Sequence, residues 1–138
     1  MNAVVYASKK GNTKKLAEAV AKAIGVTAQS VEELKPLDTS VDMLFVGGSL
    51  YAGKIDGNLR KFLQRLTSKQ VKRIAVFGTA AGNKSVIDEV RDVLKDTGIT
   101  VYGEAFQCRG SFLLANRGRP DQNDLQSAAQ FAKRALAK

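Results

Sequence analysis

Short apolar runs alternate along this chain with segments in which apolar residues recur every three or four positions. Continuous apolar stretches such as 43–46 are typical of strands that are buried on both faces of a sheet. The pattern predicts strands at about 2–7, 26–31, 42–48, 73–79 and 99–107.

Four of the intervening segments have the spacing of amphipathic helices, because their apolar residues fall on one helix face. These apolar positions are Leu16, Val20 and Ile24; Leu59, Phe62, Leu63 and Leu66; Val86, Val90, Val93 and Leu94; and Leu125, Ala128, Ala132 and Leu136.

Alternating strands and helices favour an α/β fold, a three-layer sandwich in which a five-stranded parallel sheet carries helices on both faces. Such sheets bind ligands outside the carboxyl ends of their strands, near the point where the strand order reverses. A chain of 138 residues suits one hydrophobic core, so we expect residues 1–138 to form a single domain.

Composition excludes several kinds of site. The chain has no histidine, which removes every imidazole-dependent triad and the commonest metal ligand. Cys108 is the only cysteine, so we expect neither a disulfide framework nor a metal site, and we expect Cys108 to be a small buried residue rather than a nucleophile. No apolar run approaches the ~20 residues of a membrane span, and the first strand leaves no room for a signal peptide. We therefore expect a cytoplasmic protein without integral membrane association.

The first candidate site is the turn between the first strand and the first helix. A glycine-centred turn at this place aims free backbone N–H groups and the positive end of a helix dipole at one point, which favours a phosphate. The turn has neither the glycine pattern of a dinucleotide fold nor the Gly-Lys pair of a triphosphate loop. The same residue types are also ordinary turn and cap residues. The turn consists of Ser8, Lys9, Lys10, Gly11, Asn12 and Thr13.

Two further loops follow strands on the same edge of the predicted sheet, at 47–54 and 78–84. Glycines in both loops permit close approach of a ligand, and Tyr51 offers a flat face, although it could equally be a half-buried surface aromatic. Together with the phosphate turn, these loops suit a flat phosphorylated cofactor. The candidate contacts are Ser49, Leu50, Tyr51, Ala52 and Gly53 in one loop, and Thr79, Ala80, Ala81, Gly82 and Asn83 in the other.

These three segments resemble the flavodoxin family. Residues 4–13 are similar to the first strand and the FMN phosphate loop of flavodoxins, 48–55 to the loop that flanks one face of the isoalloxazine ring, and 78–83 to the loop that flanks the other. The last predicted strand has no long insertion, which is typical of the short-chain branch. The resemblance implies a parallel sheet of order 2-1-3-4-5, FMN as cofactor, and an electron-transfer protein that carries electrons between redox partners.

The resemblance also assigns roles to individual residues. Ser8, Asn12 and Thr13 would bind the phosphate together with backbone N–H groups of 9–13, and Tyr51 would lie against the ring. The peptide between Ala52 and Gly53 would accept a hydrogen bond from reduced flavin, and a glycine tolerates the positive φ of that turn.

The chain departs from the family pattern at several positions. Lys10 replaces a hydroxyl residue of the phosphate loop, and Ala80 and Ala81 stand where many flavodoxins have an aromatic ring, so we expect one flavin face to be open. Residues 51–55 and 59–63 also resemble flavodoxin-like protoporphyrinogen dehydrogenases, which pass electrons to quinone, although the long insertion of those enzymes is missing. An FMN-dependent oxidoreductase is therefore the alternative to an electron carrier.

The formal net charge of +9 bears on partners rather than on fold. No nucleic-acid-binding motif accompanies the charge, so we expect an acidic redox protein or an anionic small-molecule substrate. Arg109, Arg117 and Arg119 follow the last strand, and we expect them near the cofactor edge. A second basic segment is either a docking surface or a solvated helix face. Its cations are Lys54, Arg60, Lys61, Arg65, Lys69, Lys72 and Arg73.

Overall fold

A computed structural model of the chain describes residues 1–8, 11–33, 40–51, 53–80, 84–110 and 118–137, with the backbone alone for Tyr51. The described residues form a parallel sheet of strand order β2-β1-β3-β5-β6, so the predicted order is confirmed. A short strand that we did not predict, β4, pairs antiparallel with the end of β3. The strands are β1 (Asn2–Tyr6), β2 (Ala28–Ser30), β3 (Val41–Tyr51), β4 (Lys54–Ile55), β5 (Val71–Ala80) and β6 (Thr100–Arg109).

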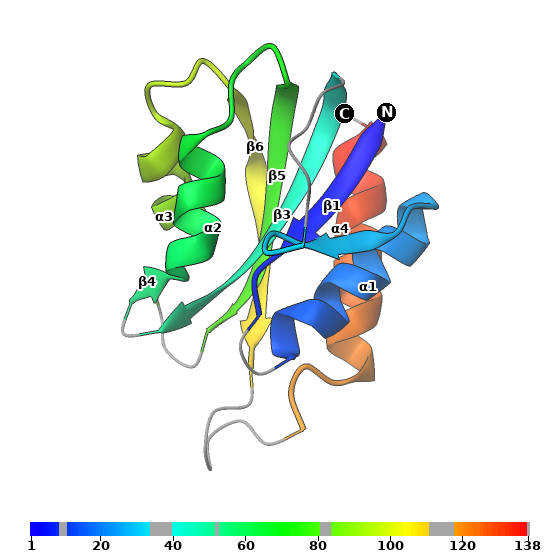
Figure 1. Cartoon of the computed structure of the whole chain (residues 1–138). Helices are drawn as coiled ribbons and strands as arrows, with labels where there is room; N and C mark the ends of the chain where they lie inside the picture. The colour runs from blue at the N-terminus through cyan, green and yellow to red at the C-terminus, as the bar shows by residue number, and fades with distance from the viewer. Residues whose placement is uncertain (9–10, 34–39, 52, 81–83, 111–117, 138) are drawn as a thin grey trace.

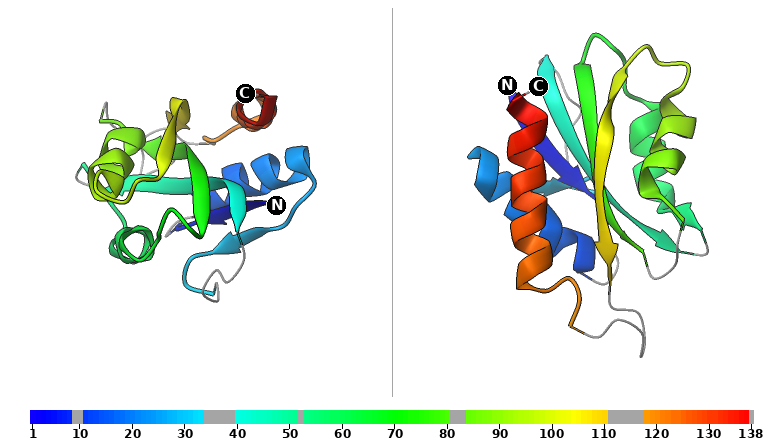
Figure 2. Two further views of the ribbon diagram at one scale, coloured as in Figure 1. Left: turned by 90° about the horizontal axis from the view of Figure 1, so that it is seen from above. Right: turned by 180° about the vertical axis from the view of Figure 1, so that it is seen from behind.

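Four helices cover the two faces of the sheet, as expected (Figure 1). Helices α1 and α4 pack on one face, and α2 and α3 pack on the other (Figure 2). Each helix has one apolar side, and burying that side against the sheet stabilises both layers. The helices are α1 (Asn12–Ile24), α2 (Gly57–Gln64), α3 (Val86–Leu94) and α4 (Gln122–Ala137).

The central strand β3 divides the core in two. Its side chains alternate, so that Leu44 and Val46 face α2 and α3 while Met43 and Phe45 face α1 and α4. All four side chains are fully buried. Phe45 meets Phe131 of α4 edge to face, with ring centroids 6.3 Å apart and an interplanar angle of 85°. Burial on both faces explains why this strand is continuously apolar in sequence.

Three glycines at the overlap of a predicted strand and a predicted loop, Gly47, Gly48 and Gly78, lie inside strands. β3 extends beyond the predicted 42–48 to Tyr51, and β5 extends beyond the predicted 73–79 to Ala80, because the pairing of these strands continues as far as Leu50 and Ala80. Gly48 and Gly78 are paired across this ladder. A Cβ on Gly78 would lie 2.2 Å from the Gly48 carbonyl oxygen, and a Cβ on Gly47 would lie 2.3 Å from the Phe77 ring. These glycines therefore mark close packing rather than a turn.

The start of α4 is held by a reciprocal capping box. The Asp124 N–H donates to the Asp121 carboxylate at 3.0 Å, and the Asp121 N–H donates to the Asp124 carboxylate at 2.8 Å. Arg119 also donates to both Asp124 oxygens, at 2.5 and 2.7 Å. The Arg119 hydrogen bonds are the main reason why the pKa of the buried Asp124 carboxyl lies below its usual range. Asp121 and Asp124 therefore cap this helix together.

None of the helices in the described ranges combines the length and the apolar content that a membrane span requires.

The contact between Gly48 and Gly78 generates a stability prediction. Gly78→Ala should lower the free energy of unfolding by roughly 2–3 kcal/mol, because the new methyl group meets backbone that cannot move aside. Gly103→Ala in β6 is a matched control, since its Cβ would meet nothing within 4 Å. That control should be neutral or stabilising by up to about 1 kcal/mol. Urea unfolding measures both variants, and equal stabilities for the two would contradict the packing described here.

The Asp124 carboxylate generates a pH prediction. Because its pKa is lower in the folded chain than in the unfolded chain, it stabilises the fold at neutral pH, and this contribution disappears as pH falls below about 4. Asp124→Asn should therefore lower the urea midpoint at pH 7 and flatten its decline below pH 4. Asp92→Asn on the exposed side of α3 should leave the acid decline in place. An Asp124→Asn variant with an unchanged acid decline would contradict this assignment.

Candidate functional site

The strands β1, β3 and β5 end on one edge of the sheet, and α1 begins at the same edge (Figure 1). The strand order reverses between β1 and β3, because β2 lies on one side of β1 and all later strands lie on the other. The edge therefore has the topology in which parallel α/β sheets bind ligands.

The turn into α1 leaves the positive end of the helix open to an anion. The Gly11 N–H donates to the Ser8 hydroxyl at 3.0 Å, which closes the turn. Gly11 itself has a φ of 83° and stands at the N-cap, where a glycine offers no side-chain oxygen to the first N–H groups of the helix. The first turn of α1 contains no acidic residue. Lys9 and Lys10 lie outside the described residues.

Three hydroxyl side chains meet directly beneath this turn. Thr13 of α1, Ser49 of β3 and Thr79 of β5 are at most 6% exposed. The Ser49 and Thr79 oxygens lie 2.8 Å apart, the Thr13 and Thr79 oxygens 3.3 Å apart, and Thr13 is also hydrogen bonded to Ser49. The Thr13 hydroxyl, which the resemblance assigns to the phosphate, thus points into the protein. We call this arrangement the hydroxyl ring.

The ends of β3 and β5 bring several other predicted contacts to the same edge. Leu50 and Ala80 are paired across the ladder and are buried. Gly53 has a φ of 78°, as the predicted turn requires. The Tyr51 backbone pairs with Lys54, but its side chain, like Ala52, Ala81, Gly82 and Asn83, lies outside the described residues. Asn12 is buried beside Gly110, whose Cβ position is 3.0 Å from the Asn12 side-chain nitrogen.

Gln107 and Lys84 also lie at this edge, although we did not identify them from the sequence as candidate site residues. The Gln107 side chain accepts from the Val86 N–H at 2.7 Å and donates to the Lys84 carbonyl at 2.8 Å, so it holds the chain between β5 and α3. A Cβ on Gly53 would lie 3.0 Å from Lys84 Nζ, which places this ammonium group against the Gly53 turn. No helical or strand periodicity distinguishes such a clamp from an ordinary exposed glutamine, so the sequence carries no signal for it.

The thiol of the one cysteine, Cys108, has low reactivity. Burial raises the pKa of the Cys108 thiol to about 12, and Asp124 adds to the rise. Its thiolate fraction near neutral pH is therefore negligible, which agrees with a structural rather than a nucleophilic cysteine. In the part of the chain that the structure describes, no three His, Cys, Asp or Glu side chains lie close enough to hold a metal ion.

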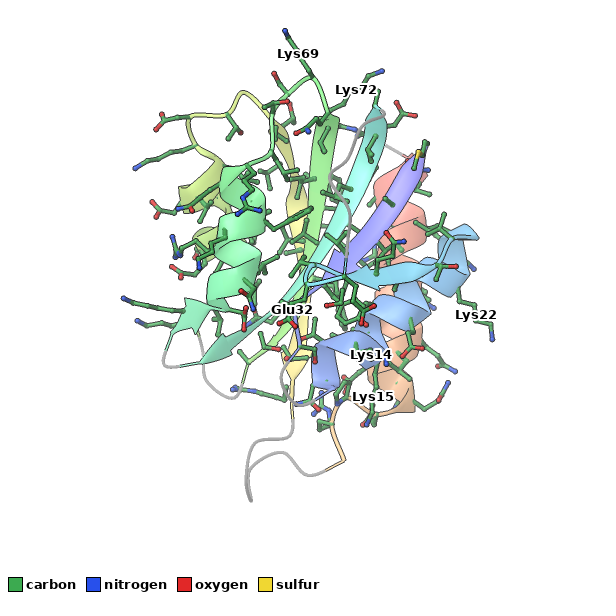
Figure 3. The ribbon with its side chains drawn as sticks, viewed as in Figure 1. Lys14, Lys15, Lys22, Glu32, Lys69 and Lys72 are labelled. Atoms are coloured by element: carbon green, nitrogen blue, oxygen red, sulfur yellow. The ribbon has the colours of Figure 1, made fainter. Side chains whose placement is uncertain are left out.

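The basic segment of 54–73 does not form one patch at the cofactor edge. Lys69 and Lys72 lie at the opposite end of the molecule from Lys14 and Lys15, which stand beside the phosphate turn (Figure 3). Lys72 pairs with Asp42 at 3.4 Å, and Arg60 pairs with Glu89 at 3.3 Å. We also expected Arg109, Arg117 and Arg119 near this edge. Arg119, however, is bound to Asp124, and Arg117 lies outside the described residues.

A groove of about 660 Å³ lies elsewhere, between the outer sides of α1 and α4. Its lining comes from α1 and α4 alone and includes three alanines and three lysines, so none of the strand ends that carry the predicted contacts lines it. We therefore place the candidate site at the carboxyl edge. The groove is lined by residues that include Lys15, Ala19, Ala23, Leu125, Ala129 and Lys133.

The donor set at the carboxyl edge fits a phosphate monoester. Backbone N–H groups at the start of α1 can donate to such a group, the helix dipole and Lys14 favour negative charge, and no carboxylate occupies the first turn. A Cβ on Gly11 would meet nothing within 4 Å, so there is open space beside the turn.

Several solved structures share the fold of this chain. A flavodoxin from the domain Archaea has a TM-score of 0.74 at 24% identity, over 99% of this chain and 97% of that chain. A short-chain flavodoxin associated with a non-canonical PDU bacterial microcompartment has a TM-score of 0.75 at 22% identity, with the same coverage. The Flv1 flavodiiron core of Synechocystis has a TM-score of 0.72 at 20% identity, and this chain covers 36% of it.

Sequence comparison identifies the family directly. No curated protein matches the chain. The family model described as a flavodoxin domain matches residues 3–108, which include the phosphate turn, the ends of β3 and β5, and all of the parallel strands as far as Cys108. The chain therefore belongs to the flavodoxin domain family.

Proposed function

We propose that this chain binds FMN at the carboxyl edge of its sheet and carries electrons between redox partners. The observation that carries the proposal is the glycine-capped N-terminus of α1, which is free of acidic residues and lies at the point where the strand order reverses. Membership of the flavodoxin domain family supports FMN as the phosphorylated ligand.

Each part of the edge has a distinct task in this proposal. Backbone N–H groups at the start of α1, with Ser8 and Asn12 as further contacts, hold the phosphate. Tyr51 and the segment 80–83 flank the two ring faces, and the Gly53 turn lies beside the ring edge. When bound, FMN supplies the redox chemistry by accepting and returning electrons, while the protein supplies binding and electrostatics.

Charge at this edge favours an anionic partner. Lys14, Lys15 and Lys84 are exposed, and among the described residues no carboxylate forms an ion pair with them. Cations within about 8–10 Å of a reduced cofactor stabilise its added negative charge at physiological salt. The same lysines would attract an acidic redox protein, which is the partner that we propose, and this attraction should weaken as salt is added.

The phosphate turn can be tested with a pair of matched variants. Gly11 and Gly25 cap opposite ends of α1, both have φ near 80°, and both have open space around the Cβ position. Valine at either position should cost similar stability, because a branched side chain disfavours positive φ. Only Gly11→Val should weaken FMN binding, by about tenfold or more, with little change in riboflavin binding. Fluorescence titration of the cofactor-free protein measures each dissociation constant.

Flavin binding by the parent protein is the reference for this test. We expect it to bind FMN more tightly than riboflavin and to show a flavin visible spectrum that changes during stepwise reduction. Equal affinity for the two flavins, or equal losses from Gly11→Val and Gly25→Val, would place the phosphate elsewhere. Catalytic turnover with a quinone would instead establish the FMN-dependent oxidoreductase that we kept as the alternative.

A further inference from the structure

The hydroxyl ring joins parts of the chain that are distant in sequence. Thr13 belongs to the first turn of α1, Ser49 to the end of β3 and Thr79 to the end of β5. Ser49 and Thr79 are also direct partners in the β3–β5 ladder. Gly110, just beyond β6, packs on the same cluster, since a Cβ there would lie 3.0 Å from Thr79 Cβ. Four segments at the candidate site therefore meet at one buried point.

The ring is satisfied within itself. Each hydroxyl has one proton to donate and can accept, so three hydroxyls at three mutual contacts can each donate once and accept once. Removing one hydroxyl leaves the others with fewer partners in a place that water does not reach. The geometry between α1 and the two strands therefore depends on all three.

We propose that the hydroxyl ring is a positioning device for the phosphate site: it fixes the N-terminus of α1 against the ends of β3 and β5. This inference rests on the proposed function. It makes Thr13, Ser49 and Thr79 positioning residues, and it differs from the family-based assignment, in which the Thr13 hydroxyl binds the phosphate itself. Residue 79 thus affects phosphate binding although its own hydroxyl is turned toward Thr13 and Ser49.

Thr79→Val separates these two interpretations. The substitution keeps the side-chain shape and removes the hydroxyl, and residue 79 has no phosphate role in the direct assignment. We expect FMN binding to weaken about fivefold, which corresponds to one lost hydrogen bond, with riboflavin binding within about twofold of the parent. Thr79→Ser keeps a hydroxyl and should bring FMN affinity back to within about twofold of the parent. Thr100→Val, at an exposed position in β6, is the matched control and should change neither affinity.

Amide hydrogen exchange of the cofactor-free protein gives an independent measure of the coupling. Thr79→Val should speed exchange in the first hydrogen-bonded turn of α1, at 15–18, whereas Thr100→Val should not. Together these results would support the positioning role. The proposal is overturned if Thr79→Val lowers thermal stability but leaves both the ratio of FMN to riboflavin affinity and the exchange at 15–18 unchanged, because the ring would then only hold the fold together.

The proposed function and the positioning role of the hydroxyl ring can be overturned separately. If the parent protein binds no flavin, the proposed function is wrong and the assignment of the ring to a phosphate site is overturned with it. If the parent binds FMN and Thr13→Val weakens that binding while Thr79→Val does not, the proposed function stands, the direct phosphate role of Thr13 is established, and the positioning role is overturned.

Discussion

The ladder between β3 and β5 is the constraint on which the other features of the site depend. It runs in register from Val41 and Val71 to Leu50 and Ala80, well beyond the apolar centre of the sheet. The extension is permitted because Gly48 and Gly78 are paired where neither has room for a side chain: a Cβ on Gly78 would strike the Gly48 carbonyl oxygen, and a Cβ on Gly48 would strike the Leu59 side chain. Because of the extension, Ser49 and Thr79 lie side by side at the carboxyl edge, and Thr13 of α1 contacts them there.

The electrostatics of the edge follow from this arrangement. The N-terminus of α1 faces the point where the strand order reverses, and its glycine N-cap supplies no side-chain oxygen to the first N–H groups. Lys14, Lys15 and Lys84 add positive charge there, whereas Arg119 is already bound to Asp124 and contributes less to the field. A basic edge with an open helix end suits a phosphorylated cofactor and an acidic partner better than it suits a cation.

The layers could be predicted from the sequence because apolar residues buried on both faces of a parallel sheet leave a strong pattern, as in 43–46. The strand order was predictable only from the resemblance to flavodoxins. The positive φ at Gly53 was also predictable, since the resemblance placed a glycine in a turn that requires it. The extension of β3 beyond 48, through Ser49, Leu50 and Tyr51, was not, because glycine is as typical of loops as of tightly packed strands. The hydroxyl ring and the Gln107 clamp depend on contacts between residues 21 to 66 positions apart, which no local pattern encodes.

Backbone amide chemical shifts measure directly where a flavin binds to this chain, which is the central claim. Adding FMN to the isotopically labelled, cofactor-free protein should move the amide signals of 11–14, Ser49, Thr79 and Gly110 most among the described residues. Signals of Ala19 and Ala129 in the groove between α1 and α4 should stay in place. Riboflavin should move the signals of β3 and β5 but largely spare those of 11–14. Shifts centred on the α1–α4 groove, or identical shifts with both flavins, would contradict the account.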